Sequence, residues 1–239
     1  MIMKSFKKSV FTFVLLIIGA TSAFGQAFTK DDPIGTVIEY QKGDKSSNIE
    51  RMILVDKKST PKGTVLSISF DDKEDFVMDI LLQDDYMIYD LSSFFHLIEN
   101  TAKEEGAPGV RFSANGDQIS IPLRPTLYAQ YPDINLKVTI KVLIFRPKVR
   151  FSITDREIVE YEKINTPMGE RNAFVYRSRW RFNLRFAGIV DEYEEFEMYQ
   201  WIVPGIGVVK ESTLSDDEKT FSKDNTKVLV KKYLPEKKK

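Results

Sequence analysis

The chain has 239 residues, with 35 basic and 35 acidic side chains, one histidine and no cysteine. The lack of cysteine excludes a thiol nucleophile, a thiolate metal site and a lipid-modified cysteine. His96 is then the sole candidate base for a serine triad, and it lies in an apolar helical stretch without nucleophile-elbow glycines. Balanced charge argues against a nucleic-acid-binding protein, which carries a strong basic excess.

The first 25 residues have the layout of a cleavable secretory signal. Three lysines precede a short apolar run, Val10–Ala20, and the small residues Ala23 and Gly25 precede the expected cleavage point. The run is well short of the ~20 residues that a membrane-spanning helix needs. Residues 1–25 are therefore predicted to be a signal peptide for export to the periplasm of a Gram-negative bacterium, with an uncleaved anchor as the alternative.

Removal of the signal leaves residues 26–239 as the predicted mature domain. It takes away three basic residues and no acidic one, so the mature chain carries 32 basic and 35 acidic side chains. A chain of this length can bury roughly 70% of its unfolded surface, which suits a single domain. We find no linker, internal repeat or transmembrane segment in it.

Before residue 90 the sequence alternates between apolar and polar residues, which predicts short antiparallel strands. These strands are Gly35–Gln41, Ile49–Asp56, Thr64–Phe70 and Phe76–Leu82. The period then changes to three and four, which predicts an amphipathic helix that begins after Asp90 and ends before Gly106. The apolar stripe of this helix consists of Leu91, Phe94, Phe95, Ile98 and Ala102.

After the helix, the Asn115-Gly116 pair predicts a hairpin between Val110–Ser113 and Gln118–Leu123. A proline-rich loop, Pro122–Asp133, follows. Longer strands are then expected at Leu136–Phe145, Lys148–Ile164, Arg171–Phe186, Glu192–Val203 and Thr226–Leu234, with a sharp bend at Pro204–Gly207. A sheet of about eleven strands must curl or split. The fold class is therefore mainly β, a curved antiparallel half-barrel with one or two covering helices.

The segment Tyr176–Phe186 is the most regular strand. Its even-numbered positions are mostly aromatic or apolar, whereas its odd-numbered positions are arginines and one asparagine. A hairpin with the following acidic run would place Arg179 and Arg181 near Glu195 and Glu197. The arginine stripe is then a solvated outer face neutralised by its neighbour, and an anion-binding surface is the alternative.

Large apolar side chains are candidates for lining a hollow inside the sheet. Trp180 on the aromatic face and Trp201 just before the Pro204–Gly207 bend are both expected to point to the concave side, with ordinary core packing as the alternative. The candidate ligand-lining residues are Leu91, Phe94, Phe95, Ile98, Tyr176, Trp180, Phe182 and Trp201. No residue is assigned a catalytic or metal-binding role.

Three pairs of adjacent aspartates are alternative candidates for acid–base chemistry or calcium binding. They are Asp71-Asp72, Asp84-Asp85 and Asp216-Asp217, and each lies in a predicted turn or loop. None has the alternating spacing of a calcium loop. Solvated turn carboxylates are the favoured interpretation, and a hydrolase that acts on glycans or peptidoglycan through paired carboxylates is a minor alternative.

Two segments resemble a protein family. The Thr166-Pro167-Met168-Gly169 turn and the Trp201–Glu211 segment, with the signature W-x-x-P-G-I-G-x-V-K, are similar to the TapB-like proteins, exported domains of unknown function that are abundant in Bacteroidetes. The segments Gly35–Tyr40 and Asn115–Pro122 also fit. The resemblance implies a half-barrel of the LolA/LolB type, whose open side is covered by helices, and it implies no catalytic residues.

The sequence therefore predicts a periplasmic, non-enzymatic binding or carrier protein for a hydrophobic or amphipathic envelope molecule. A lipid or lipoprotein acyl chain is the expected ligand, and no cofactor, metal or nucleic acid is expected. The alternative is a structural or protein-interaction component of the envelope with a packed interior. Such a component would present an exposed patch, for which Leu127, Tyr128 and Tyr131 are candidates.

Overall fold

The computed structural model describes residues 27–43, 48–70, 77–104, 110–141, 146–186, 190–215, 220–221 and 226–235. The predicted signal peptide, residues 1–25, lies outside these ranges. The described residues form one large antiparallel sheet of 14 strands and the helix α2. The elements are β1 (Val37–Lys42), β2 (Ile49–Thr60), β3 (Gly63–Phe70), β4 (Val77–Leu82), β5 (Tyr86–Tyr89), α2 (Leu91–Glu104), β6 (Arg111–Gly116), β7 (Ser120–Pro122), β8 (Gln130–Tyr131), β9 (Ile134–Lys141), β10 (Lys148–Thr166), β11 (Gly169–Phe186), β12 (Val190–Val203), β13 (Gly207–Ser215) and β14 (Thr226–Tyr233).

The count of 14 strands corrects the expected eleven, and the three strands that the sequence missed have separate causes. β5 is only four residues long, and the two-residue β8 lies inside the proline-rich loop. β13 was missed because Pro204–Gly207 was interpreted as a bend within a strand. It is instead the turn between β12 and β13, where Gly205 and Gly207 have φ angles of 78° and 107° that favour glycine.

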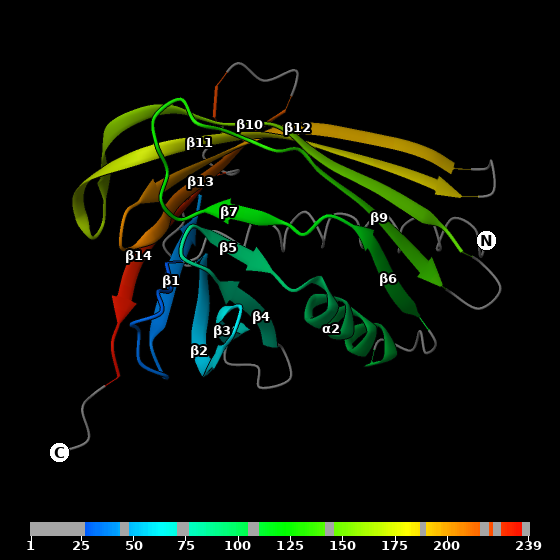
Figure 1. Cartoon of the computed structure of the whole chain (residues 1–239), viewed down its shortest axis with the longest axis horizontal. Coiled ribbons are helices and arrows are strands. Elements are labelled where there is room, and N and C mark those ends of the chain that lie inside the picture. Colours follow the sequence, from blue (N-terminus) through cyan, green and yellow to red (C-terminus); the bar gives the residue numbers. More distant parts are fainter. Residues whose placement is uncertain are drawn as a thin grey trace.

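The sheet curls until its two ends approach each other (Figure 1). The strand order is β6-β9-β10-β11-β12-β13-β14-β1-β2-β3-β4-β5-β7, and β8 pairs with β10 off this path. The terminal strands β6 and β7 are joined by residues 117–119 alone, and such a link spans at most about 14 Å. The sheet is not closed, because the pairs of β6 and β7 are with β9 and β5.

This pairing corrects the predicted hairpin at Asn115-Gly116. Asn115 and Gly116 continue β6 and pair with Lys137 and Leu136 of β9. The chain then crosses to the other end of the sheet, where Ser120 of β7 pairs with Ile88 of β5. The Asn-Gly pair therefore does not form the predicted turn between two paired strands.

The helix α2 confirms the predicted helix and its start. Asp90 caps it, because its Oδ1 accepts a hydrogen bond from the backbone N–H of Ser92 at 2.8 Å. The main contacts of α2 within the described residues are with β4 and β6, near opposite ends of the strand order (Figure 1). Phe95 is buried and stacks on Phe112 of β6, with ring centroids 5.7 Å apart.

The core lies on the inner side of the curled sheet. Alternate residues of most strands are buried there, as expected for a sheet with one face on the core. Ile38 and Tyr40 of β1 and Leu66 and Ile68 of β3 show the pattern, and the buried residues of β9–β12 belong to the same cluster.

Candidate functional site

An aromatic face lines the inner side of β10, β11 and β12. We define it as Phe151, Trp180, Phe182 and Phe196. Phe151 meets Trp180 and Phe182 edge-on, at centroid distances of 5.2 and 4.6 Å. Phe196 stacks on Trp180 and Phe182 at 6.1 and 5.9 Å. Such ring pairs each contribute about 0.5–1.5 kcal/mol beyond area burial.

The predicted lining residues are divided between two places. Tyr176, Trp180 and Phe182 share the inner face of β11, as the alternation predicted, and all three are buried. Leu91 is partly buried and packs on the core, whereas Phe95 lies against β6. The side chains of Phe94 and Ile98 lie outside the described part of the chain, so their predicted role stays a prediction.

Trp201 lies on the other face of the sheet, which corrects the expectation that both tryptophans point to the concave side. Cross-strand pairing places Trp201 opposite Val175, whereas Trp180 is opposite Phe196. Because side chains alternate along β12, Trp201 and Phe196 point to opposite faces. The Trp201 ring meets Phe221 edge-on at 5.8 Å, and Nζ of Lys210 lies 4.0 Å from its centroid.

A polar row continues the inner face beyond the aromatic residues. We define it as Gln200 of β12, Glu211 of β13 and Lys227 of β14, which are cross-strand neighbours. All three are buried. Nε2 of Gln200 donates to Oε2 of Glu211 at 2.7 Å, and Nζ of Lys227 binds Oε2 of Glu50 at 2.5 Å.

Burial raises the pKa of Glu211 to about 8, although Lys227 and the hydrogen bond from Gln200 oppose the shift. Oε1 of Glu211 is buried and has no hydrogen-bond partner among the described residues. A buried polar atom without a partner costs free energy. Sequence analysis missed this row because β13 was not predicted, although Glu211 follows the buried Val209 by two positions.

Arg156 joins the two ends of the sheet from the inside. It is buried on β10, and its Nε donates to Oη of Tyr176 at 2.7 Å. Its Nη1 donates to the carbonyl oxygen of Pro132 at 2.5 Å and its Nη2 to that of Ser120 on β7 at 2.7 Å. Tyr131 lies between Tyr86 and Tyr176, at centroid distances of 6.4 and 6.0 Å. Tyr131 is therefore half-buried in this junction and is not part of an exposed patch.

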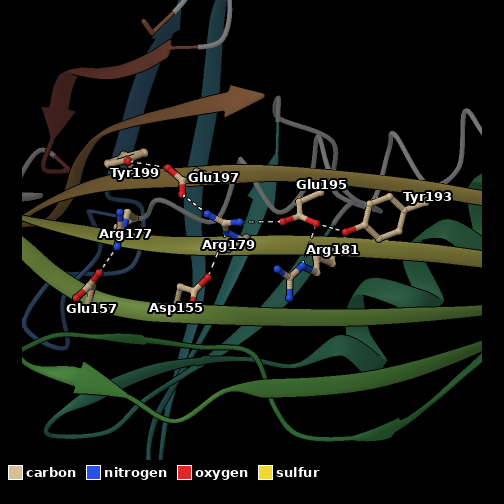
Figure 2. Close-up of polar contacts among 9 residues, drawn as sticks. All are labelled: Asp155, Glu157, Arg177, Arg179, Arg181, Tyr193, Glu195, Glu197 and Tyr199. Carbon is tan, nitrogen blue, oxygen red and sulfur yellow. Dashed lines mark hydrogen bonds and ion pairs between the residues drawn. The ribbon is translucent and has the colours of Figure 1, made fainter. Parts of the chain in front are cut away.

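On the outer face of β11 the arginines form a ladder of ion pairs (Figure 2). Arg179 binds Glu195 and Glu197 of β12 at 3.2 and 2.9 Å. Arg181 binds Glu195 at 3.0 Å, which confirms the predicted hairpin pairing. On the β10 side, Arg177 pairs with Glu157 and Arg179 with Asp155.

The ladder shifts the titration of Glu195 and Arg179 toward their charged forms. The hydrogen bond from Arg181 lowers the pKa of Glu195, and the hydrogen bond to Glu197 raises the pKa of Arg179. Arg177, Arg179 and Arg181 are each paired with carboxylates (Figure 2). This supports the interpretation as a neutralised outer face over that of an anion-binding surface.

The remaining candidates for chemistry do not assemble into a centre. The side chain of His96 is 78% exposed, 3.8 Å from Glu99. Asp84 and Asp85 are exposed in the bend before β5, whereas Asp71-Asp72 and Asp216-Asp217 lie outside the described residues. Within the described ranges, no three His, Cys, Asp or Glu side chains are placed to hold a metal ion. No helix in these ranges is long and apolar enough to span a membrane.

Comparisons with known proteins identify the family and the fold. The family model described as DUF3108-like matches residues 35–225. A Bacteroides fragilis protein, inferred to be exported and with a YmcC-like fold, has a solved structure that is 18% identical, with a TM-score of 0.51. An inferred lipoprotein from Parabacteroides distasonis is 16% identical, with a TM-score of 0.52. Each alignment covers 87% of this chain and 99% of the other. No curated protein matches the chain.

Proposed function

This chain belongs to the DUF3108-like family, and from that premise we propose that it is a periplasmic, non-enzymatic binding or carrier protein. Its ligand is a hydrophobic or amphipathic envelope molecule, such as a lipid or the acyl chain of a lipoprotein. The observation that carries the proposal is the aromatic face on the inner side of a strongly curled, unclosed sheet.

The position of α2 supports this assignment. The helix packs mainly on β4 and β6, whereas the aromatic face belongs to β10, β11 and β12. The helix therefore covers a different part of the inner side. An open curled sheet with an aromatic interior fits the half-barrel carriers of the LolA/LolB type, and apolar and aromatic linings are typical of ligand sites.

Export supports the assignment as well. The two structural neighbours are described as an exported protein and a lipoprotein, and residues 1–25 of this chain have the layout of a signal peptide. Cleavage of this segment is expected to leave residues 26–239 as the exported form. We propose that hydrocarbon occupies the aromatic face in this exported form.

Native mass spectrometry of the protein purified from its own periplasm tests the proposal. We expect an adduct with the mass of a lipid or acylated molecule, and stabilisation when lipid is added after delipidation. A ligand at about 100 times its Kd stabilises the native state by about 2.7 kcal/mol, which for a protein of this size is a Tm increase of about 5–10 °C. A homogeneous unliganded mass together with an unchanged Tm would contradict the proposal.

A structural or protein-interaction component is the second candidate, and two observations favour it. The aromatic face is buried, as in an ordinary core, and the proline-rich loop exposes apolar side chains. Tyr128 is 75% exposed with a φ angle of 64°, and Leu127 beside it is also exposed. A stoichiometric protein partner that is lost in a Tyr128→Ser variant, with no lipid adduct, would favour this candidate.

A further inference from the structure

The inner face changes from aromatic to polar along β12. Phe196, Met198 and Gln200 alternate onto the same side of the strand, and Gln200 pairs with Glu211 of β13. Four residues of extended strand separate Phe196 from Gln200, a distance of about 14 Å. The inner face therefore offers an apolar region and a polar region at a spacing that suits an amphipathic molecule.

Within the polar region, Glu211 has unused hydrogen-bonding capacity. Its residue is 3% exposed, Oε2 accepts from Gln200, and Oε1 has no partner among the described residues. The neighbouring polar groups are already engaged. Lys227 binds Glu50, and Oη of Tyr40 donates to the carbonyl oxygen of Val208 at 2.7 Å.

We propose that Oε1 of Glu211 receives the uncharged hydroxyl head group of an amphipathic ligand whose hydrocarbon lies on the aromatic face. This inference rests on the proposed function and specifies its ligand class. A hydroxyl group both donates and accepts, so it can pair with Oε1 whether the carboxyl group is neutral or ionised.

The charges around Glu211 disfavour the two charged classes of head group. A carboxylate or phosphate would lie near Glu50, whose charge already raises the pKa of Glu211, and like charges that share a buried site disfavour ionisation. An ammonium group would lie near Lys227, whose charge already acts on Glu211. Uncharged polar heads avoid both penalties, which is the basis of the selectivity that we infer.

Binding of three probes with the same hydrocarbon chain tests this inference. The protein is expressed with its own leader, purified from the periplasm, delipidated and titrated with dodecanol, dodecanoate and dodecylammonium below their aggregation limits. We expect dodecanol to bind at least about tenfold more tightly than either charged probe, the value of one buried hydrogen bond. Equal affinities would overturn the assignment of Glu211 but leave the proposed function intact, whereas no binding of any probe would overturn both.

Two variants then locate the selectivity. Glu211→Leu removes the polar atoms at similar volume, and we expect dodecanol affinity to fall about tenfold, to the level of the charged probes. Glu211→Gln keeps a hydrogen-bonding group and is expected to retain the preference for dodecanol. Glu197→Gln, on the outer face of β12, is the matched control and is expected to bind as the unsubstituted protein does. Unchanged selectivity in Glu211→Leu, or equal loss in Glu197→Gln, would contradict the inference.

Discussion

The two faces of β11 are stabilised by different interactions. On the inner face, Trp180 and Phe182 are enclosed by other rings and are held by area and shape. On the outer face, Arg179 and Arg181 remain partly exposed and are held by carboxylates of β12 (Figure 2). The charges of the outer face are therefore paired within the sheet, although Nε of Arg177 has no hydrogen-bond partner among the described residues. On the inner face the same is true of a carboxyl oxygen, Oε1 of Glu211. The outer face of β11, despite its regular charge pattern, is therefore the weaker candidate for a ligand site.

The same contrast exists between two arginines. Arg156 is buried, and its guanidinium bonds groups from three separate segments. Arg179 has more carboxylate partners, but its side chain is 33% exposed. Exposed ion pairs contribute little because water and salt screen them. Stability should therefore depend on the inner arginine far more than on the outer ladder.

The largest effect is expected for Arg156→Ala. The substitution leaves Oη of Tyr176 and the carbonyl groups of Pro132 and Ser120 without their donor. Each unsatisfied buried group costs about 1–3 kcal/mol, so the free energy of unfolding should fall by about 3–5 kcal/mol. Urea denaturation measures it. Arg150→Ala, at an exposed position of the same strand, is the control and should change stability by less than about 0.5 kcal/mol. A loss below about 1 kcal/mol for Arg156→Ala would contradict the claim that stability depends more on Arg156 than on the outer ladder.

The next effect concerns pH and sharpens the account of the polar row. Burial raises the pKa of Glu211 from 4.5 to about 8 in the folded protein, so the folded state binds the extra proton between these values. The stabilisation is complete below pH 4.5 and is lost as pH rises toward 8. Relative to Glu211→Gln, the protein should lose up to about 1.4 kcal/mol per pH unit in this window. Parallel pH profiles of the two proteins would show that Glu211 titrates normally.

A smaller effect is expected for the outer ladder. Arg179→Ala should reduce the free energy of unfolding by about 0.2–1 kcal/mol, and this difference should shrink in about 1 M salt. A double-mutant cycle with Glu197→Ala, measured by denaturation at low and high salt, isolates the pair. A coupling energy as large as the effect of Arg156→Ala would mean that the ion pairs of the outer face stabilise the fold as much as Arg156 does.

The smallest effect is expected at His96. Its side chain is 78% exposed on α2, so His96→Gln should change stability by less than about 0.5 kcal/mol and leave probe binding unchanged. Thermal unfolding and the dodecanol titration measure both. Loss of binding would bring α2 into the ligand site and would contradict its separation from the aromatic face.

The local features were predictable from the sequence because they have strong periodic signals. The alternation in Tyr176–Phe186 set the faces of β11, and the spacing of Leu91 and Phe95 predicted α2. The prediction for the face of Trp201 was wrong. The Pro204–Gly207 turn was interpreted as a bend, and the alternation of side chains along β12 was not extended to Trp201. The face of Trp201 follows from its pairing with Val175, which is eleven residues before Phe186, where β11 ends.

The long-range features were not predictable, because no local pattern encodes them. Asn115-Gly116 indicated a turn, but the pairing of β6 with β9 and of β7 with β5 depends on the arrangement of the whole sheet. Arg156 and Ser120 are 36 residues apart in sequence. Glu211 lies in a short polar run of β13, Lys210–Thr213, that resembles a loop. The polar part of the candidate site therefore depends on long-range strand pairing and could not be predicted from the sequence.

Tryptophan fluorescence tests the central claim most directly, because the chain has two tryptophans and they lie on opposite faces of the sheet. Trp201→Phe leaves Trp180 as a reporter of the inner face, and Trp180→Phe leaves Trp201 as a reporter of the outer face. Titration of the delipidated exported protein with dodecanol should shift the emission of Trp180 and leave that of Trp201 unchanged. A response of Trp201 alone, or of neither residue, would contradict binding on the aromatic face.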